Sequence, residues 1–249
     1  MSLYTVSGII IRRYPLGEAD TIVHILSKER GKVEAVAKGA RRIRSRLLAV
    51  TQPFILGEYL LFAGRSLERI NQGEIECAYR RLREDLNLFA LCTFCCELVD
   101  KVVQVGEPAP KVFYLTKGLL DYLHSDQPER LHLENALTYY LIKLLDALGY
   151  QVDFSSCLLC GAKTGLTAFS IVEGGPLCSS CSSNDLNSLR FQPAVFCSLD
   201  KLSSLGWAKL GIIKLGPYQS EIEKLLETFY HYHLEVETRS AAFWKSIRS

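Results

Sequence analysis

Short hydrophobic stretches alternate with polar positions through the first 80 residues and end at turn-forming residues. Valine, isoleucine and tyrosine are frequent in these stretches, and glycine or proline separates most of them, which is typical of β-strands. The pattern predicts five strands, at residues 4–13, 21–27, 32–38, 54–63 and 68–77. Five strands in so short a segment favour a small closed barrel, with the OB-fold as first choice and an SH3-like barrel as the alternative.

After residue 80 the hydrophobic positions recur every three or four residues, which is the periodicity of an amphipathic helix. Six helices are predicted, at residues 85–105, 110–124, 129–148, 193–205, 217–236 and 239–247. Pro110 suits the first turn of the second helix, and Gly149 is well placed to end the third. We expect these helices to pack together as a bundle.

Three cysteines of the first predicted helix, Cys92, Cys95 and Cys96, lie on its hydrophobic stripe. Their spacing includes a formal CxxC pair, so metal binding or redox chemistry is the alternative. We interpret them as small hydrophobic side chains of a core. Cys197, in the fourth predicted helix, is interpreted in the same way.

Two further CxxC pairs stand between the third and fourth predicted helices, with 17 residues between them. This spacing fits two tight turns that each present two thiolates to one tetrahedral zinc ion. Glycines flank the pairs, and the hydrophobic residues between them predict a short hairpin. The predicted ligands of one structural zinc ion are Cys157, Cys160, Cys178 and Cys181.

The composition is that of a soluble protein, with 48% hydrophobic and 22% charged residues in a chain of 249. No hydrophobic run approaches the length of roughly 18 to 20 residues that spans a bilayer. The first residues lack the features of a signal peptide, so we expect a reducing cytoplasm and no membrane association. In that compartment the nine cysteines are expected to be free thiols or metal ligands rather than disulfides.

Positive charge is concentrated in the first 80 residues, which carry 13 Lys or Arg against 8 Asp or Glu. The most basic stretch lies between the third and fourth predicted strands, where a flexible loop could follow a phosphate backbone. The alternative is a solvated loop without a partner. Tyr4, Tyr14 and Tyr59 could stack on bases, or they could belong to the core. The candidate phosphate-binding residues are Lys38, Arg41, Arg42, Arg44 and Arg46, with Lys28, Arg30 and Lys32 at the second turn extending the surface.

Catalytic patterns are weak in this sequence. His132 and Glu134 followed by Pro176 and two cysteines resemble a zinc deaminase signature superficially, but Leu177 separates the proline from the first cysteine. A zinc ion with four thiolate ligands leaves no position for a reactive water. Neither an HExxH motif nor a phosphate-binding P-loop is present. The sequence therefore predicts a protein that is not an enzyme.

The N-terminal part resembles a known family through three segments, GIIIR from Gly8, LGEAD from Leu16 and GKVEAVAKGARRIRSR from Gly31. QPF from Gln52 and IECAYRRLR from Ile75 follow in the same order. Together these segments closely resemble the signature of the bacterial recombination mediator RecO. The later part is similar in its order of helices, four-cysteine module and further helices. This chain has all four cysteines, so it resembles the zinc-containing members of the family.

The resemblance implies an α+β multidomain protein with an N-terminal five-stranded OB-fold barrel and a C-terminal helical bundle that contains an inserted four-cysteine zinc module. The expected domains are an OB-fold at 1–80, a helical domain at 81–155 that 185–249 completes, and the zinc module at 156–184.

In function, the resemblance implies binding of single- and double-stranded DNA and annealing of complementary strands. The implied partners are RecR, single-stranded DNA-binding protein and, indirectly, RecA. An RNA-binding or ribosome-associated OB-fold protein with a structural zinc ribbon is the alternative.

Overall fold

The computed structural model describes residues 2–125 and 130–248. Contacts divide the chain into two compact units, one formed by residues 1–127 with 238–249 and the other by residues 128–237. The two units do not coincide with the domain ranges expected from the sequence, because they divide the helices at other positions. The expected ranges stay a prediction. Within the described ranges no helix is both long enough and hydrophobic enough to span a membrane.

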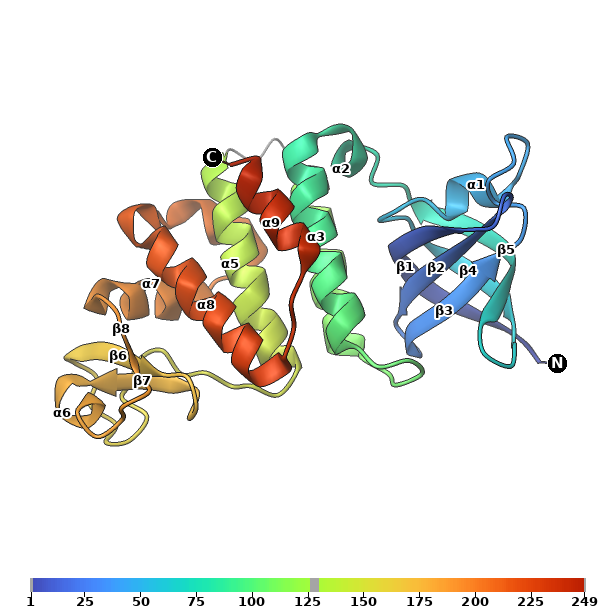
Figure 1. The fold of residues 1–249 in the computed structure, drawn as a ribbon. Helices are drawn as coiled ribbons and strands as arrows, with labels where there is room; N and C mark the ends of the chain where they lie inside the picture. The colour runs from blue at the N-terminus through green and yellow to red at the C-terminus, as the bar shows by residue number, and fades with distance from the viewer. Residues whose placement is uncertain (1, 126–129, 249) are drawn as a thin grey trace. The chain divides into compact units, whose positions relative to one another are not determined.

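The first unit begins with a closed barrel (Figure 1). Its strands pair in the order β1-β2-β3-β5-β4, and β4 pairs back to β1. The helix α1 (Leu47–Val50) lies between β3 and β4, and β3 pairs with β5 in parallel. This topology confirms the OB-fold. The strands are β1 (Leu3–Leu16), β2 (Asp20–Ser27), β3 (Gly31–Ala37), β4 (Leu56–Phe62) and β5 (Glu68–Cys77).

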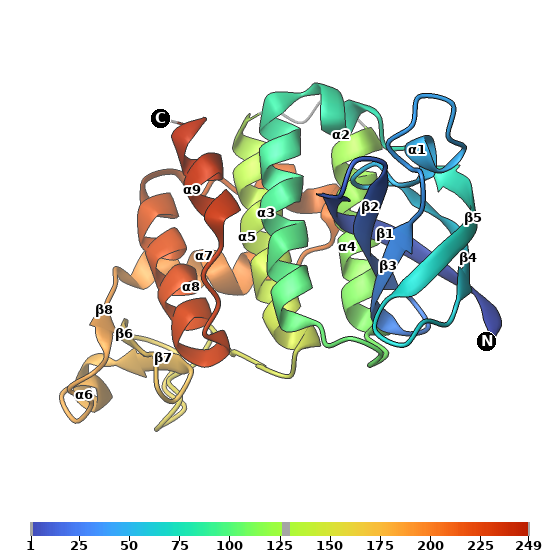
Figure 2. The ribbon, with the colours of Figure 1, turned by 45° about the vertical axis from the view of Figure 1, so that its right-hand side comes forward.

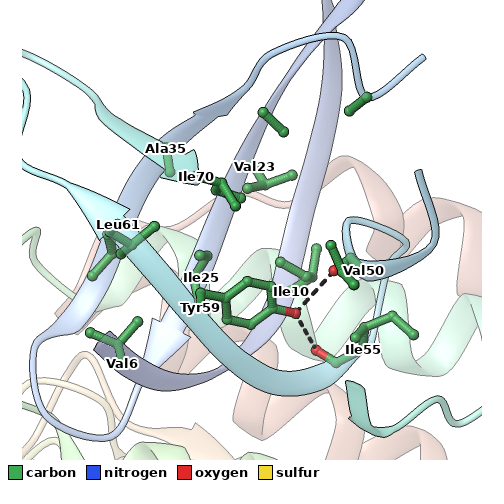
Figure 3. Close-up of a cluster of buried hydrophobic side chains, with 13 residues drawn as sticks. Val6, Ile10, Val23, Ile25, Ala35, Val50, Ile55, Tyr59, Leu61 and Ile70 are labelled. Atoms are coloured by element: carbon green, nitrogen blue, oxygen red, sulfur yellow. Dashed lines mark hydrogen bonds between the residues drawn. The ribbon is translucent and has the colours of Figure 1, made fainter. Parts of the chain in front are cut away.

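The barrel interior is filled by alternate residues of the strands, as a period of two requires (Figure 3). Val23 and Ile25 of β2 are fully buried, and β3 alternates between buried and partly buried positions along its whole length. Tyr59 lies among these side chains, and its hydroxyl donates hydrogen bonds to the carbonyl oxygens of Val50 (3.0 Å) and Ile55 (3.4 Å). Burial raises the pKa of Tyr59 far above its ordinary value, so this tyrosine belongs to the core.

Four helices complete the first unit, and α3 and α4 lie beside the barrel (Figure 2). Asp85 caps α3, because its carboxylate accepts hydrogen bonds from the backbone N–H groups of Asn87 (2.8 Å) and Leu88 (3.0 Å). The C-terminal helix packs along α3. The helices are α2 (Arg81–Glu84), α3 (Leu86–Val102), α4 (Pro110–Ser125) and α9 (Arg239–Ser246).

The turn between β2 and β3 touches the loop that follows α3. Gly31 has a φ of +59°, and a Cβ atom at this position would lie 1.8 Å from the carbonyl oxygen of Glu107. Only glycine tolerates both the left-handed backbone and so close an approach. The turn therefore fixes the barrel against this helical part of the same unit.

The cysteines of α3 are core residues, as the sequence predicted. Cys92, Cys95 and Cys96 are each at most 1% exposed. Burial raises the pKa of all three thiols, that of Cys96 to about 12, so they stay protonated and unreactive. Cys197, by contrast, is exposed on α7 (Pro193–Ser203), so its interpretation as a core thiol was wrong.

The second unit combines helices with a small sheet of order β7-β6-β8. The predicted hairpin between the cysteine pairs is present as β6 and β7 (Figure 1). The first residue of the helix predicted at 129–148 lies outside the described residues. The elements are α5 (Arg130–Ala147), β6 (Leu166–Ser170), β7 (Gly175–Cys178), α6 (Ser179–Ser182), β8 (Leu189–Arg190), α7 (Pro193–Ser203), η1 (Trp207–Ile212), η2 (Gly216–Tyr218) and α8 (Gln219–Leu234).

Candidate metal site and basic surface

The four predicted zinc ligands come together at one end of the small sheet. The sulfur atoms of Cys157, Cys160, Cys178 and Cys181 all lie within 4.8 Å of one another. Those of Cys160 and Cys178 are 3.7 Å apart. Zinc–sulfur bonds of about 2.3 Å in a tetrahedron would place the sulfur atoms about 3.8 Å apart. The four cysteines could therefore hold a metal ion.

Two tight turns position these thiols. In the first, the N–H of Gly161 donates to the carbonyl oxygen of Cys157 (2.8 Å), and Gly161 has a φ of +72°. Cys178 ends β7 and leads directly into α6, which carries Cys181. The N–H of Leu158 donates to the carbonyl oxygen of Pro176 in β7 (2.8 Å), so a backbone hydrogen bond joins the first turn to the strand that leads into the second.

The thiols resist losing all their protons in the absence of a cation. Burial opposes ionisation of Cys157, but backbone N–H groups, first that of Cys178, outweigh it and lower the pKa of Cys157 to about 6. Contacts with Cys178 and Cys160 raise the pKa of Cys181 to about 12. A divalent cation would remove this conflict, because it stabilises all four thiolates together. The four cysteines thus form a site that fits a zinc ion, the cofactor expected from the sequence.

This geometry does not support the zinc deaminase interpretation. Cys178 and Cys181 share their site with two further thiols, so a bound metal would be coordinatively closed. The side chain of His132 lies outside the described residues. In the described part of the chain, the three cysteines of α3 form no second group of metal ligands.

A basic loop, residues 38–46, connects β3 to α1, and the tip of the β1–β2 hairpin supports it. The carboxylate of Asp20 accepts a hydrogen bond from the N–H of Gly39 (2.7 Å) and lies 3.4 Å from the Lys38 ammonium. The Arg41 N–H donates to Ala19 (2.9 Å), and its guanidinium donates to the carbonyl oxygen of Gly17 (2.7 Å). The loop is therefore attached to the barrel at its first half.

The cations of the basic loop lie on the surface. Lys38, Arg41, Arg42, Arg44 and Arg46 are all exposed, and Ile43 between them is 94% exposed. Among residues 2–125 and 130–248, Lys38 is the one loop cation with a carboxylate within ion-pair distance. The charge of Arg42 is felt by Asp20, but none of the loop arginines has a carboxylate within ion-pair distance in the described ranges, as a phosphate-binding surface requires.

The other three predicted cations lie elsewhere. Lys28 and Arg30 are in the β2–β3 turn, at the opposite end of β3 from the basic loop and about 20 Å along the strand. Arg30 lies 4.0 Å from the ring centroid of Tyr4. Lys32 donates to the backbone oxygen of Asp100 (2.5 Å), and its side chain is 13% exposed. The structure thus separates these three residues from the basic loop.

A charged network that the sequence did not predict joins the barrel to α3. Asp100 is 5% exposed, and its two carboxylate oxygens contact Arg12 Nη1 (2.8 Å) and His24 Nδ1 (2.5 Å). His24 Nε2 in turn lies 2.7 Å from the Tyr14 hydroxyl. Burial favours the neutral form of Asp100, but the hydrogen bonds from His24 and Arg12 outweigh it and lower the pKa of Asp100. Period-two alternation places Arg12 and His24 on one face of the barrel, but it cannot indicate their partner on α3.

A cavity of about 590 Å³ lies next to the end of the basic loop. Arg46 and Leu47 form one wall, and Glu58 of β4 and Glu74 of β5, which pair across the strands, form another. Two adjacent carboxylates repel a phosphate. A phosphate-binding surface at the basic loop would therefore end at Arg46 rather than continue into this cavity.

Fold and site together define the class: an OB-fold protein with a helical part and a four-cysteine module that could hold a metal ion. The family profile described as "Recombination protein O N terminal" matches residues 1–79, and "Recombination protein O C terminal" matches residues 83–242. Between them the two profiles cover nearly the whole chain. The protein belongs to the RecO family, which confirms the resemblance and gives it a role in DNA repair.

Three relatives match the chain over nearly their whole length. The chain is similar to the DNA repair protein RecO of Symbiobacterium thermophilum, with 36% identity over 100% of this chain and 99% of that protein. The DNA repair protein RecO of Bacillus pumilus is 31% identical over 97% of this chain and 93% of that protein. That of Alkaliphilus metalliredigens is 32% identical over 94% of each chain.

Proposed function

We propose that this protein is a non-enzymatic recombination mediator that binds single- and double-stranded DNA and anneals complementary strands. The observation that carries the proposal is the basic loop, in which exposed arginines project from an OB-fold barrel and, among the described residues, have no carboxylate within ion-pair distance. OB-folds bind nucleic acid strands through one face and its adjoining loops. The names of the relatives, DNA repair proteins, support DNA as the ligand.

The proposed mechanism is electrostatic. Two complementary strands repel each other through their phosphates, and this repulsion opposes their encounter. Arg41, Arg42, Arg44 and Arg46 would neutralise phosphates of both strands and release their counterions. Such contacts carry little base preference, because phosphate groups are the same at every position.

The proposed partners follow from the family. RecR would join the protein on DNA, and together they would help RecA replace single-stranded DNA-binding protein. The proposed location is the cytoplasm, in association with the nucleoid. The proposed role of a zinc ion at the four cysteines is structural, because the surrounding strands β6 and β7 are short and a bound ion would stabilise them.

Strand annealing on coated DNA tests this function. One strand is precoated with single-stranded DNA-binding protein, and pairing with its complement is followed by fluorescence energy transfer, with and without RecR. We expect the triple variant R41A/R42A/R44A to slow annealing about ten-fold or more, because three phosphate contacts are lost. Annealing by this variant at the rate of the wild type would contradict the proposal.

A charge-matched control separates the loop from net charge. Lys201, Lys209 and Lys214 are exposed in the second unit, and replacing all three with alanine removes the same charge. We expect this control to anneal like the wild type. Competition between single-stranded DNA and structured RNA tests the RNA-binding alternative. Preferential binding of RNA would support that alternative.

A further inference from the structure

One face of the barrel presents a row of partly exposed side chains next to the basic loop. Tyr14 of β1 pairs with Ile22 of β2, and Ile22 pairs with Val36 of β3, so the three side chains share the outer face. All three are at least partly accessible, and Tyr14 is 36% exposed. Lys38 follows Val36 by two residues, about 7 Å along β3. We refer to Tyr14, Ile22 and Val36 as the Tyr14 row.

The helix α3 contacts the middle of the neighbouring row, at His24, and leaves the Tyr14 row accessible. Arg12, His24 and Glu34 pair across the same three strands, two residues further along the face. His24 is buried there by its contact with Asp100 of α3. The open part of the face is thus the part nearest the basic loop.

Tyr14 is held by its hydroxyl group and by contacts at its ring, where the Arg12 guanidinium lies 6.0 Å from the ring centroid. His24 Nδ1 donates to the ionised Asp100 carboxylate, so in the neutral imidazole Nε2 accepts from the Tyr14 hydroxyl. The His24 ring meets the Tyr14 ring edge-on, with centroids 5.4 Å apart and an angle of 80° between the planes. The phenol is therefore fixed in orientation while part of its ring stays exposed to solvent.

The other tyrosines of the barrel that were considered for stacking differ from Tyr14. Tyr59 is fully buried, and Tyr4 lies under the guanidinium of Arg30 at the far end of β1. Tyr14 alone among these three combines an exposed ring, a fixed hydroxyl and a position beside the basic loop. Aromatic rings held next to cationic loops are how OB-folds bind unpaired strands.

We propose that Tyr14 is a stacking platform for an unpaired base of single-stranded DNA, and that His24 and Asp100 are positioning residues that hold its ring. This inference rests on the proposed function, since it assumes that the basic loop binds DNA phosphates. A base on Tyr14 would leave its flanking phosphates within reach of Lys38 and Arg41. Stacking requires an unpaired base, so the platform distinguishes single strands from duplexes.

Binding of matched probes tests the inference. Fluorescein-labelled oligothymidine and a duplex of the same length are titrated with the full chain, and fluorescence anisotropy gives both dissociation constants. We expect Tyr14→Ala to weaken binding of oligothymidine about ten-fold and to leave duplex binding within about two-fold. Tyr114→Ala, which removes an exposed tyrosine of α4, is the matched control and should change neither constant.

Photocrosslinking tests the position of the ring directly. Oligonucleotides containing 5-iodouracil are bound at saturating protein, irradiated and mapped by mass spectrometry, with Tyr14 expected as the main adduct. Tyr14→Phe keeps the ring but loses the hydrogen bond to His24, so we expect a lower yield per bound oligonucleotide. His24→Gln should lower the yield in the same way, and thermal melting verifies that both variants are folded.

Three outcomes would overturn the inference: unchanged oligothymidine affinity in Tyr14→Ala, an equal loss for duplex and single strand, or adducts elsewhere than Tyr14. If R41A/R42A/R44A loses DNA binding while Tyr14→Ala does not, the stacking platform is wrong and the proposed function stands. If the loop variant also binds like the wild type, the proposed function itself is wrong.

Discussion

At the scale of single residues, Asp100 has the most unusual environment in the first unit. It is a buried carboxylate surrounded by Arg12, His24 and Lys32, which all come from the barrel while Asp100 comes from α3. A buried charge is tolerated when it is paired and hydrogen-bonded, and removing one member exposes the others to the full cost of burial. The network thus makes the docking of α3 on the barrel specific to these side chains.

Replacing Asp100 with asparagine should destabilise the protein by about 3 kcal/mol near neutral pH, because the mostly buried Lys32 ammonium and the partly exposed Arg12 guanidinium lose their counter-charge. Urea unfolding followed by circular dichroism measures this loss. Asp146→Asn is the matched control, because the ion pair between Asp146 and Lys143 is partly exposed and should contribute less than about 1 kcal/mol. Equal losses for the two variants would contradict the network's role.

The contribution of Asp100 should also disappear in acid. The folded-state pKa of Asp100 is lowered, so its stabilisation is complete above the unfolded value of about 3.9 and is lost as the pH falls through the folded value. The difference in unfolding free energy between wild type and Asp100→Asn should therefore shrink below about pH 4. A difference that stays constant down to pH 3 would show that the carboxylate charge is not what stabilises the fold.

Residue-level patterns in the sequence predicted local chemistry well, but they did not predict tertiary contacts. The spacing of Cys157, Cys160, Cys178 and Cys181 identified a group that the structure brings together. The same reasoning misjudged Cys197, because a thiol at a helical period does not reveal which face of a short helix is covered. The partner of His24 is 76 residues away, at a distance that no local pattern can indicate.

At the scale of elements, the four-cysteine module combines short buried strands with tight turns that carry the cysteines. Its strands β6 and β7 have five and four residues, and a backbone hydrogen bond joins the first cysteine-bearing turn to the strand that leads into the second. Strands this short are marginally stable by themselves. Phe169 of β6 contacts Phe229 of α8, which attaches the module to the helices of its own unit.

Replacing Cys178 with serine should lower zinc content and stability together, because binding energy at a structural zinc site is folding energy. We expect bound zinc to fall well below one ion per chain and the free energy of unfolding to fall by about 3 kcal/mol or more. Elemental mass spectrometry measures the zinc content, and urea unfolding measures the stability. Cys197→Ser changes an exposed thiol outside the site and serves as the control. Full retention of zinc by Cys178→Ser would contradict the assigned ligand set.

Strong periodicity made most elements predictable, and short or context-dependent elements were missed. The strand predicted at 68–77 coincides with β5, and the helix predicted at 110–124 differs from α4 by one residue. The helix α1 has only four residues, too few to show a periodic pattern. The packing of α9 on α3 joins segments more than 130 residues apart, so the sequence alone could not assign α9 to the first unit.

At the scale of the whole molecule, the proposed metal site and the basic loop belong to different compact units. Each unit has its own buried residues, and the loop is held by hydrogen bonds to the β1–β2 hairpin of its own barrel. If the zinc ion is structural, its removal should not change the electrostatics of the loop. Function and metal binding would then be separable in experiments.

Removing the metal should therefore leave DNA binding nearly intact. We expect Cys178→Ser to bind single-stranded DNA within about two-fold of the wild type at a temperature where the barrel stays folded, because the phosphate contacts are unchanged. Fluorescence anisotropy measures the affinity, and thermal melting defines the temperature. A ten-fold loss without unfolding of the barrel would show that the module itself contributes to the DNA-binding surface.

The salt dependence of single-stranded DNA binding tests the central claim most directly, because it counts phosphate contacts. The affinity of the wild type and of R41A/R42A/R44A is measured over a series of salt concentrations, with the Lys201, Lys209 and Lys214 alanine variant as control. The proposed role of the basic loop predicts that the slope of log affinity against log salt falls in magnitude by about 2 in the loop variant, at roughly 0.7 per lost contact, and stays unchanged in the control. Equal slopes for the wild type and the loop variant would contradict it.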